Sequence, residues 1–286
     1  MRRNRINRCK PLLGTYVDVS IEADLDDEQL LDISIDAFEA ISRVHDKLGF
    51  HSPESELSEV NRWSQSGTKE PIPISEDLRT VMELALQLSA ASEGLFDVTI
   101  APRLVQQGSL PHLHHDAILS GTGNWQDVHL TEDGLAFSAP VLIDLGGIAK
   151  GYAVDQAIER IAANKMHVDI KLNVNAGGDL YLSNWQEESV GVRYPDEPNK
   201  HYEMPMLAPA LATSACYFSE QDSVMIHPGS GEALVRGYSV SVFAEQCMLA
   251  DALTKLAFLN PRDSRVIRQF KGRAFLLDSQ NGLLEL

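Results

Sequence analysis

Cysteine and long apolar runs are scarce in this sequence of 286 residues. Its three cysteines, Cys9, Cys216 and Cys247, are too few and too scattered for a disulfide framework or a cysteine-based zinc site. Because no stretch approaches ~18 consecutive apolar residues, we expect no helix inserted in a membrane. The charged start, residues 1–10, is not followed by an apolar run, so we expect no secretory signal peptide and a cytoplasmic location.

Positive charge is also scarce, because 24 Lys and Arg residues stand against 41 Asp and Glu residues, and the formal net charge is −17. This balance excludes a general nucleic-acid-binding protein, which presents a basic surface to phosphates. It equally disfavours docking on an anionic membrane. Any anion that the protein binds must therefore be held by local cations. The apolar fraction of 44% is ordinary for a globular protein that buries a sizeable core.

Hydrophobic periodicity predicts strands and helices that do not alternate regularly. We expect a first strand at 15–21, an amphipathic helix over 26–48, and a helix that Ser75 opens and Gly94 stops. The later expected elements are a hairpin at 128–137, strands at 141–144, 170–176, 190–194, 234–243 and 274–278, and helices at 152–163 and 246–258. Hairpins mixed with helices indicate an α+β fold with mixed or antiparallel sheets. We expect a single domain over residues 1–286, or two closely packed subdomains within it.

The densest chemical signal runs from Asp144 to Asp155 and reads Asp-Leu-Gly-Gly-Ile-Ala-Lys-Gly-Tyr-Ala-Val-Asp. A buried strand ends in an acid, glycines permit a tight turn, and a helix begins near Lys150. Free N–H groups at a helix start, together with one ammonium, suit a phosphate. The block is neither a P-loop nor a dinucleotide fingerprint, so a plain strand–turn–helix joint with a surface lysine is the alternative.

With seven shorter stretches in the same order, this block resembles the ApbE family of FAD:protein FMN transferases. The matching stretches are 13–15, 55–61, 94–99, 144–155, 175–179, 212–214, 228–231 and 250–253. The resemblance implies an ApbE-like, T-fold-like α+β domain that binds FAD as its substrate. It also implies a divalent metal such as Mg²⁺, cleavage of the FAD pyrophosphate, and transfer of FMN to a Thr or Ser hydroxyl of an acceptor flavoprotein.

The resemblance assigns roles to individual residues as well. The residues that match FAD-contacting positions are Leu13, His51, Leu95, Phe96, Asp97, Asp144, Lys150 and Met225. Gly147 matches the residue whose backbone carbonyl binds the metal, and Asp251 matches a metal-binding acid. A metal and a lysine would together neutralise the charge of the phosphoryl groups during transfer.

The metal site departs from the family's pattern. In the family an Asp is followed four residues later by a Thr, whereas here Lys255 stands four residues after Asp251 and Thr254 is one place early. In one interpretation the ammonium of Lys255 replaces the metal, because a charged lysine and a divalent cation in contact repel each other. The alternatives are a surface ion pair worth about 0.2–0.5 kcal/mol and a metal site that uses Thr254.

A second departure concerns the proton acceptor. Val224 stands where the family has a His that is a candidate base for the acceptor hydroxyl, and His227 stands where it has an Asp. His227 is the candidate here, although strand alternation points positions 224 and 227 to opposite faces. Asp179, after Gly177 and Gly178, either lines the site or caps a turn. FMN transfer, FAD binding without transfer, and FAD hydrolysis to FMN and AMP are the three candidate functions.

Overall fold

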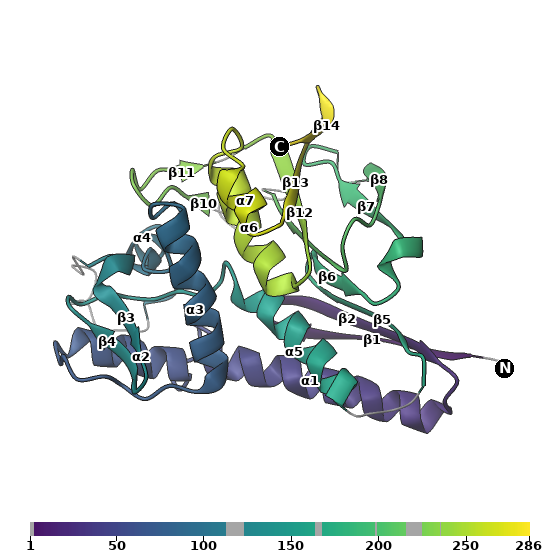
Figure 1. Cartoon of the computed structure of the whole chain (residues 1–286), viewed down its shortest axis with the longest axis horizontal. Helices are drawn as coiled ribbons and strands as arrows, with labels where there is room; N and C mark the ends of the chain where they lie inside the picture. Colours follow the sequence, from purple (N-terminus) through teal and green to yellow (C-terminus); the bar gives the residue numbers. More distant parts are fainter. Residues whose placement is uncertain (1–2, 113–122, 164–167, 198, 216–224, 235) are drawn as a thin grey trace. The chain divides into compact units, whose positions relative to one another are not determined.

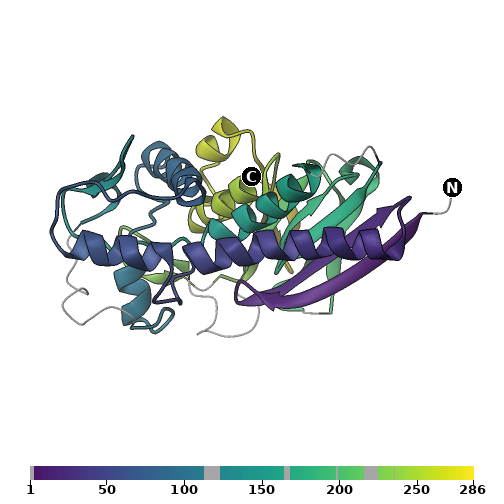
Figure 2. The same cartoon turned by 90° about the horizontal axis from the view of Figure 1, so that it is seen from below.

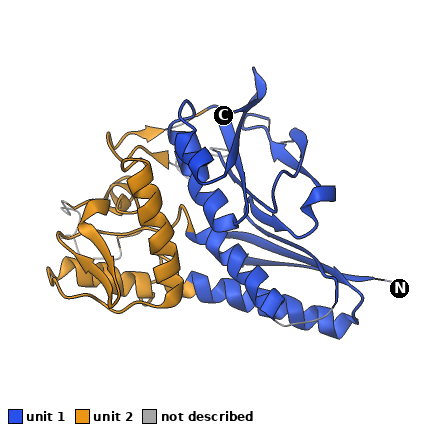
Figure 3. Cartoon of the chain, viewed as in Figure 1, with its two compact units in different colours: residues 1–45, 149–217, 237–286 blue, residues 46–148, 218–236 orange. Residues whose placement is uncertain are grey.

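The computed structural model describes residues 3–112, 123–163, 168–197, 199–215, 225–234 and 236–286 (Figure 1). Val224, at the position of the family's histidine, and Cys216 lie outside these ranges. The chain divides into two compact units, shown in different colours in Figure 3. Unit 1 comprises Met1–His45, Ala149–Tyr217 and Gly237–Leu286, and unit 2 comprises Asp46–Ile148 and Phe218–Arg236.

Unit 1 is built on an eight-stranded sheet with the order β1-β2-β5-β6-β9-β12-β13-β14. Its strands are β1 Asn4–Leu12, β2 Thr15–Ala23, β5 Lys171–Ala176, β6 Asp179–Leu182, β9 Ala210–Ser214, β12 Tyr238–Ala244, β13 Arg273–Asp278 and β14 Gly282–Glu285. Every neighbouring pair in this order is antiparallel. An antiparallel sheet with helices packed on it confirms the predicted α+β class.

The β1–β2 hairpin contains a strand that the sequence did not predict. The predicted first strand, 15–21, is confirmed as β2, but β1 precedes it and pairs with it from Asn4 opposite Ala23 to Leu12 opposite Thr15. Partly buried and exposed residues alternate along β1. An edge strand needs backbone pairing on one side only, so its polar, charged sequence gives little signal. The two loop residues, Leu13 and Gly14, have φ of 56° and 70°, as a two-residue type I′ turn requires.

Helices cover one face of the sheet. They are α1 Asp27–Leu48, α5 Ala149–Ala163, α6 Cys247–Leu259 and the short α7 Arg265–Gln269. Figure 2 shows α1 lying beside the β1–β2 hairpin and α5. Arg8 on β1 donates to Ser34 on α1, and Arg43 on α1 donates to Gln156 on α5. The predicted helices at 26–48, 152–163 and 246–258 are confirmed, although α5 begins three residues earlier than expected.

Helices α5 and α6 approach each other closely at Gly151. A Cβ atom at this position would collide with the backbone of Cys247 and Met248, so the contact requires glycine. Asp155, one turn further along α5, accepts hydrogen bonds of 2.8 Å from the backbone N–H groups of both Cys247 and Met248. The carboxylate therefore caps the N-terminus of α6 and fixes its register against α5.

The other face of the sheet is partly covered by a hairpin of β7 Ser189–Arg193 and β8 His201–Pro205. Between the hairpin and the sheet lies an apolar cluster of Leu180, Val192, Met204, Met206, Leu211, Phe243, Phe275 and Leu277. Because β12 lies between this cluster and helix α6, nearly all of its residues are buried. The middle of the sheet is therefore a rigid base for side chains that point toward α6.

Unit 2 combines short helices with small hairpins. Its elements are α2 Glu56–Gln65, α3 Glu76–Ala91, α4 Ala101–Gln106, the 3-10 helix η2 Trp125–Asp127, and strands β3 Val128–Thr131, β4 Gly134–Phe137, β10 Met225–Ile226 and β11 Ala233–Leu234. The hairpin at 128–137 and the helix that Ser75 caps are confirmed. In the described part of the chain, no helix is both long and apolar enough to cross a membrane.

Residues 141–144, which were predicted as a strand, form none. They are mostly buried, and side chains of helix α2 bind their backbone in place of a neighbouring strand. Asn61 donates to the carbonyl of Ile143 at 2.9 Å and accepts from its N–H at 2.7 Å. Ser64 accepts from the N–H of Val141. These bonds satisfy the buried backbone as a neighbouring strand would.

Candidate active site

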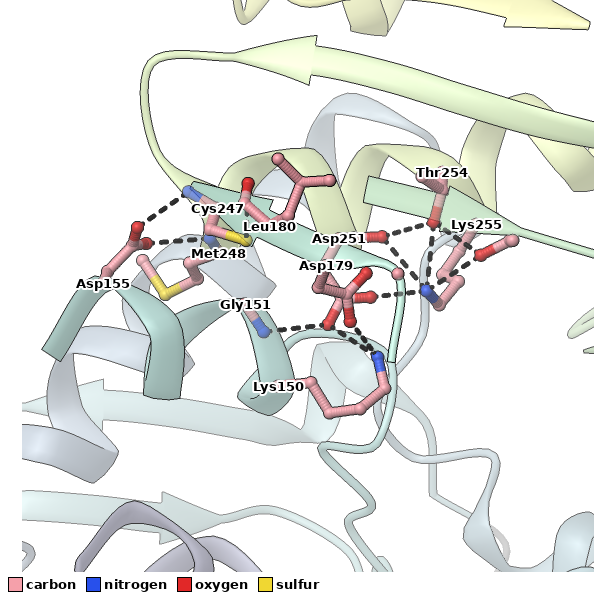
Figure 4. A network of polar contacts seen from close by, with 12 residues as sticks. Lys150, Gly151, Asp155, Asp179, Leu180, Cys247, Met248, Asp251, Thr254 and Lys255 are labelled. Atoms are coloured by element: carbon pink, nitrogen blue, oxygen red, sulfur yellow. Dashed lines mark hydrogen bonds and ion pairs between the residues drawn. The ribbon is translucent and has the colours of Figure 1, made fainter. Parts of the chain in front are cut away.

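Four charged side chains meet in the interior of unit 1 (Figure 4). Lys150 lies in the first turn of α5, Asp179 is the first residue of β6, and Asp251 and Lys255 are one turn apart on α6. Asp251 is fully buried and Asp179 is 2% exposed. We call these four residues the Lys–Asp cluster. Buried charges of this kind are costly unless they are paired and hydrogen-bonded, and here all four are.

Each carboxylate oxygen of Asp251 contacts a lysine. Lys255 Nζ lies 2.5 Å from Asp251 Oδ1, and Lys150 Nζ lies 3.4 Å from Asp251 Oδ2. The backbone N–H of Gly151 also donates to Oδ2, at 3.2 Å. Lys150 makes a further, short ion pair with Asp179. The two carboxylates thus hold two ammonium groups, and Lys150, with 30% of its side chain exposed, is the more accessible of the two.

Asp179 reaches the cluster through a glycine turn. Gly177 and Gly178 have φ of 66° and 104° between β5 and β6, and the N–H of Gly178 donates to Asn175 Oδ1 at 2.9 Å. This turn starts β6 with the carboxylate of Asp179 directed toward Lys150. The sequence left two roles open for Asp179, lining the site or capping a turn. Its ion pair with Lys150 supports the first role.

The charges of the cluster shift each other's pKa values. Burial opposes ionisation of Asp251, but the ammoniums of Lys150 and Lys255 hold its pKa below the ordinary value. Burial and the nearby charge of Asp251 raise the pKa of Asp179 to about 6, against the attraction of both lysines. Burial would lower the pKa of Lys150, but Asp179 and Asp251 raise it instead. At neutral pH Asp251 and Lys150 are therefore both ionised.

Two hydroxyl groups complete the surroundings of Lys255. Its Nζ lies 3.0 Å from Thr254 Oγ1 and 3.2 Å from Ser214 Oγ. The hydroxyl of Thr254 donates to the backbone carbonyl of Asp251 at 2.6 Å, so it is Ser214 that donates in the 2.7 Å bond between the two hydroxyls. The Asp251–Lys255 pair has side-chain exposures of 0% and 17%, so the surface-pair interpretation is wrong.

The implied Mg²⁺ does not fit this arrangement of residues. Mg²⁺ binds oxygen ligands at about 2.0–2.1 Å in near-octahedral geometry. Asp251 and Thr254, the implied side-chain ligands, both already contact Lys255. Across the described residues, no group of three or more His, Cys, Asp and Glu side chains is placed to hold a metal. Gly147, whose carbonyl is the third implied ligand, lies in the turn before α5, at the end of unit 2.

Unit 2 contributes a loop that follows helix α3. The N–H of Gly94, at φ 83°, donates to the carbonyl of Ser89 at 2.8 Å and ends the helix, as predicted. Phe96 is buried, and Asp97 accepts bonds of 2.8 and 2.6 Å from the N–H and hydroxyl of Thr99. Burial raises the pKa of Asp97 in spite of these bonds. Leu95, the third predicted residue of this loop, is half-buried.

An open pocket of 440 Å³ lies beside this loop within unit 2. Its lining includes Gly94, Asp97, Asn124, Trp125, Pro228 and Gly229. A Cβ atom at Gly94 would collide with the indole of Trp125, so glycine is needed there for packing as well as for its positive φ. Trp125 was missed in the sequence analysis, because it is distant from the matching stretches and carries no motif of its own.

Near this pocket, His227 organises a turn. Its Nδ1 accepts bonds from the N–H groups of Gly229 at 3.1 Å and Ser230 at 3.3 Å. A neutral imidazole that accepts at Nδ1 carries its proton on Nε2 and can only donate there. Arg103, also missed from sequence, donates to the carbonyls of His227 and Pro228. The geometry therefore supports a turn-forming role for His227 and gives no support to its predicted role as proton acceptor.

The remaining predicted FAD contacts divide between the units. In unit 2, burial raises the pKa of Asp144, against a bond from the N–H of Gly146 and the attraction of nearby His51. The N–H of Asp144 donates to the carbonyl of Val98, which places it beside the Asp97 loop. Met225, also in unit 2, pairs with Leu234. Leu13 lies in the β1–β2 turn of unit 1, the unit that also holds Lys150.

Known proteins resemble this chain over most of its length. The sequence profile of the ApbE family matches residues 13–276. The FAD:protein FMN transferase of Vibrio cholerae is 28% identical over 273 residues, which cover 87% of this chain and 79% of the relative. The protein of the same name from Haemophilus influenzae is 27% identical over 247 residues, which cover 77% of this chain and 70% of that relative.

Solved structures share the fold. The flavin transferase ApbE from Vibrio cholerae has a TM-score of 0.80 at 22% identity, and the comparison covers 100% of this chain and 97% of that one. The ApbE protein from Thermotoga maritima has a TM-score of 0.81 at 23% identity, with 99% and 97% covered. The fold similarity therefore extends over both units.

Proposed function

Since the matched profile spans nearly the whole sequence, this chain belongs to the ApbE family, and we propose that it transfers the FMN moiety of FAD to a Thr or Ser hydroxyl of an acceptor flavoprotein. The names of the Vibrio cholerae and Haemophilus influenzae relatives support this proposal. The observation that carries it is the Lys–Asp cluster, in which the partly exposed ammonium of Lys150 lies in the first turn of α5.

The transfer needs positive charge at the FAD pyrophosphate. The acceptor oxygen forms a bond to the phosphorus of the FMN half, the bond to the bridging oxygen breaks, AMP leaves, and the hydroxyl proton passes to a base or to water. Lys150 would neutralise the phosphate oxygens, helped by the N-terminal dipole of α5. Asp179 and Asp251 keep Lys150 protonated and direct its ammonium.

Unit 2, taken by itself, also contains residues that the family resemblance assigns to FAD binding. The 440 Å³ pocket combines an aromatic side chain, Trp125, with the carboxyl group of Asp97. Polar groups at fixed positions in a pocket orient a ligand through hydrogen bonds, and an aromatic ring adds apolar contact area. We propose that Asp97 and Asp144 accept hydrogen bonds from ribose or ring N–H groups of FAD, and that Leu95, Phe96 and Met225 supply apolar contacts.

The implied Mg²⁺ is the second source of positive charge in the family resemblance. A bound Mg²⁺ polarises phosphoryl oxygens, which favours attack on phosphorus. In this chain Lys255 contacts its implied side-chain ligands, Asp251 and Thr254. Whether Mg²⁺ or Lys255 assists Lys150 can therefore be tested separately from the transfer itself.

The proposed function is tested by incubating the protein with FAD and a candidate acceptor, and by recording intact masses and nucleotide products. A mass increase of the acceptor by FMN, with release of AMP, is the expected result. Lys150→Ala should abolish the increase, whereas Lys47→Ala should not, because Lys47 pairs with Asp77 outside the candidate site.

Two other results would overturn the transfer. Release of FMN and AMP with no mass increase would identify an FAD pyrophosphatase. Tight FAD binding with neither product would identify a flavin-binding protein without transferase activity. The second result would agree with the turn-forming role of His227, which leaves the described part of the site without an assigned base.

A further inference from the structure

We infer that the ammonium of Lys255 takes the place of the divalent cation on Asp251, so that this chain binds no metal ion there and faces its substrate with two lysines. The identity of that substrate, a dinucleotide pyrophosphate, rests on the proposed function. The exclusion of a metal from Asp251 rests only on the contacts within the Lys–Asp cluster.

The first support is the all-oxygen environment of Lys255 Nζ. The ammonium contacts Asp251 Oδ1 at 2.5 Å and the backbone carbonyl of Asp251 at 3.2 Å. It also contacts the hydroxyl oxygens of Thr254 and Ser214. Carboxylate, carbonyl and hydroxyl oxygens are the ligands that hard divalent cations prefer. The ammonium, with three donors of its own, therefore sits among the atoms that would otherwise serve a metal.

The second support is that these oxygens already take part in hydrogen bonds within and around the Lys–Asp cluster. The hydroxyl proton of Thr254 is donated to the carbonyl of Asp251, and its oxygen accepts from both Lys255 and Ser214. Asp251 Oδ2 is bonded to Gly151 and Lys150. This arrangement disfavours the metal site that would use Thr254.

The third support is electrostatic. Two carboxylates and two ammoniums balance within the Lys–Asp cluster before any substrate arrives. A divalent cation on Asp251 would lie in contact with the charge of Lys255, in a place where Asp251 is fully buried and water screens little. With only 17% of its side chain exposed and four oxygen contacts, Lys255 is held in place. The lysine and the metal therefore exclude each other.

The test is a titration of the full chain with Mn²⁺, followed by the electron paramagnetic resonance signal of the free ion, without FAD. The wild-type protein should bind no Mn²⁺ at Asp251, so its titration curve should match that of Asp251→Asn. Lys255→Thr frees Asp251 Oδ1 and places a hydroxyl at this position. This variant should gain one saturable site per chain and bind Mn²⁺ at least tenfold more tightly than the wild-type protein does. Lys200→Thr, which removes an exposed ion pair with Glu197 three residues away, is the matched control and should behave as wild type.

The inference fails if wild type binds one Mn²⁺ that Asp251→Asn abolishes. It also fails if folded Lys255→Thr, judged by its circular dichroism, gains no site. The wild-type titration alone remains decisive if Lys255→Thr does not fold.

A second measurement separates this inference from the proposed function. FMN transfer by wild type should proceed at an unchanged rate in the presence of EDTA. If transfer requires Mg²⁺ and Mn²⁺ binds at Asp251, the inference is wrong while the proposed function stands. If wild type transfers no FMN under any condition and still binds no Mn²⁺ at Asp251, the proposed function is wrong while the exclusion of the metal stands.

Discussion

The two units build their candidate sites by different means. In unit 1 the site consists of charged side chains on α5, α6 and β6, held by one another in the interior. In unit 2 it consists of loops, whose backbone groups are bound by side chains such as Asn61 and Arg103. A change in unit 1 therefore unbalances buried charge, whereas a change in unit 2 releases a local segment. The two kinds of change are expected to differ in size.

The largest effect is expected for Asp251→Ala in unit 1. The substitution leaves Lys255 without a carboxylate, and loss of one partner of a buried ion pair costs about 3–5 kcal/mol. Urea denaturation should show this loss in the free energy of unfolding. Glu197→Ala, which removes an exposed pair with Lys200, is the control and should change the transition little. Equal effects of the two substitutions would mean that the Lys–Asp cluster does not stabilise the fold.

The corresponding change in unit 2 is Asn61→Ala. It leaves the buried N–H and C=O groups of Ile143 unpaired, at a cost of about 2–4 kcal/mol for the two groups together. It should also weaken FAD binding, because Asp144 follows Ile143 directly; equilibrium dialysis would measure the affinity. Gln65→Ala removes one bond, to the carbonyl of Val141, and should cost less. If Asn61→Ala lowers the free energy of unfolding no more than Gln65→Ala does, the side chain of Asn61 does not hold residues 141–144 in place.

A smaller effect is expected for Gly151→Ala in unit 1. In an unobstructed helix this change stabilises by about 1 kcal/mol, because alanine has the higher helix propensity. Here the added Cβ collides with the backbone of Cys247 and Met248, and such overpacking costs about 1–3 kcal/mol. Thermal denaturation would measure it. Gly237→Ala is the control, because a Cβ there meets nothing within 4 Å. A rise in the melting temperature of Gly151→Ala would show that α5 and α6 have room between them.

The sequence was a good guide where structure is local. Helix α1, the hairpin of β3 and β4, and helix α6 follow from periodicity and turn residues, because neighbouring residues determine them. Residues 141–144 were predicted as a strand because they form a short apolar run. Such a run indicates burial, but it does not show what pairs with the backbone. Their partner is a helix about 80 residues earlier, which binds them through Asn61 and Ser64.

The candidate site was predictable in part for the same reason. Lys150, Asp251 and Lys255 follow from motifs and from the four-residue spacing on one helix. Asp179 was left between two roles, since Gly177 and Gly178 indicate a turn but not what the next carboxylate meets. Ser214 lies within a matching stretch, yet its contact with Lys255 depends on the pairing of β9 with β12 beneath α6. Such contacts join distant segments, so no local pattern contains them.

The smallest effect is expected at His227, and it separates structure from catalysis in unit 2. Asn at this position keeps an acceptor for the N–H groups of Gly229 and Ser230, whereas Ala removes it. If His227 only closes the turn, His227→Asn should retain the rate of FMN transfer. His227→Ala should lose about 0.5–1.5 kcal/mol of local stability per hydrogen bond and bind FAD more weakly. Single-turnover measurements would distinguish the roles, because loss of a catalytic base slows both variants alike. Equal loss of rate in both variants would show that His227 takes part in catalysis.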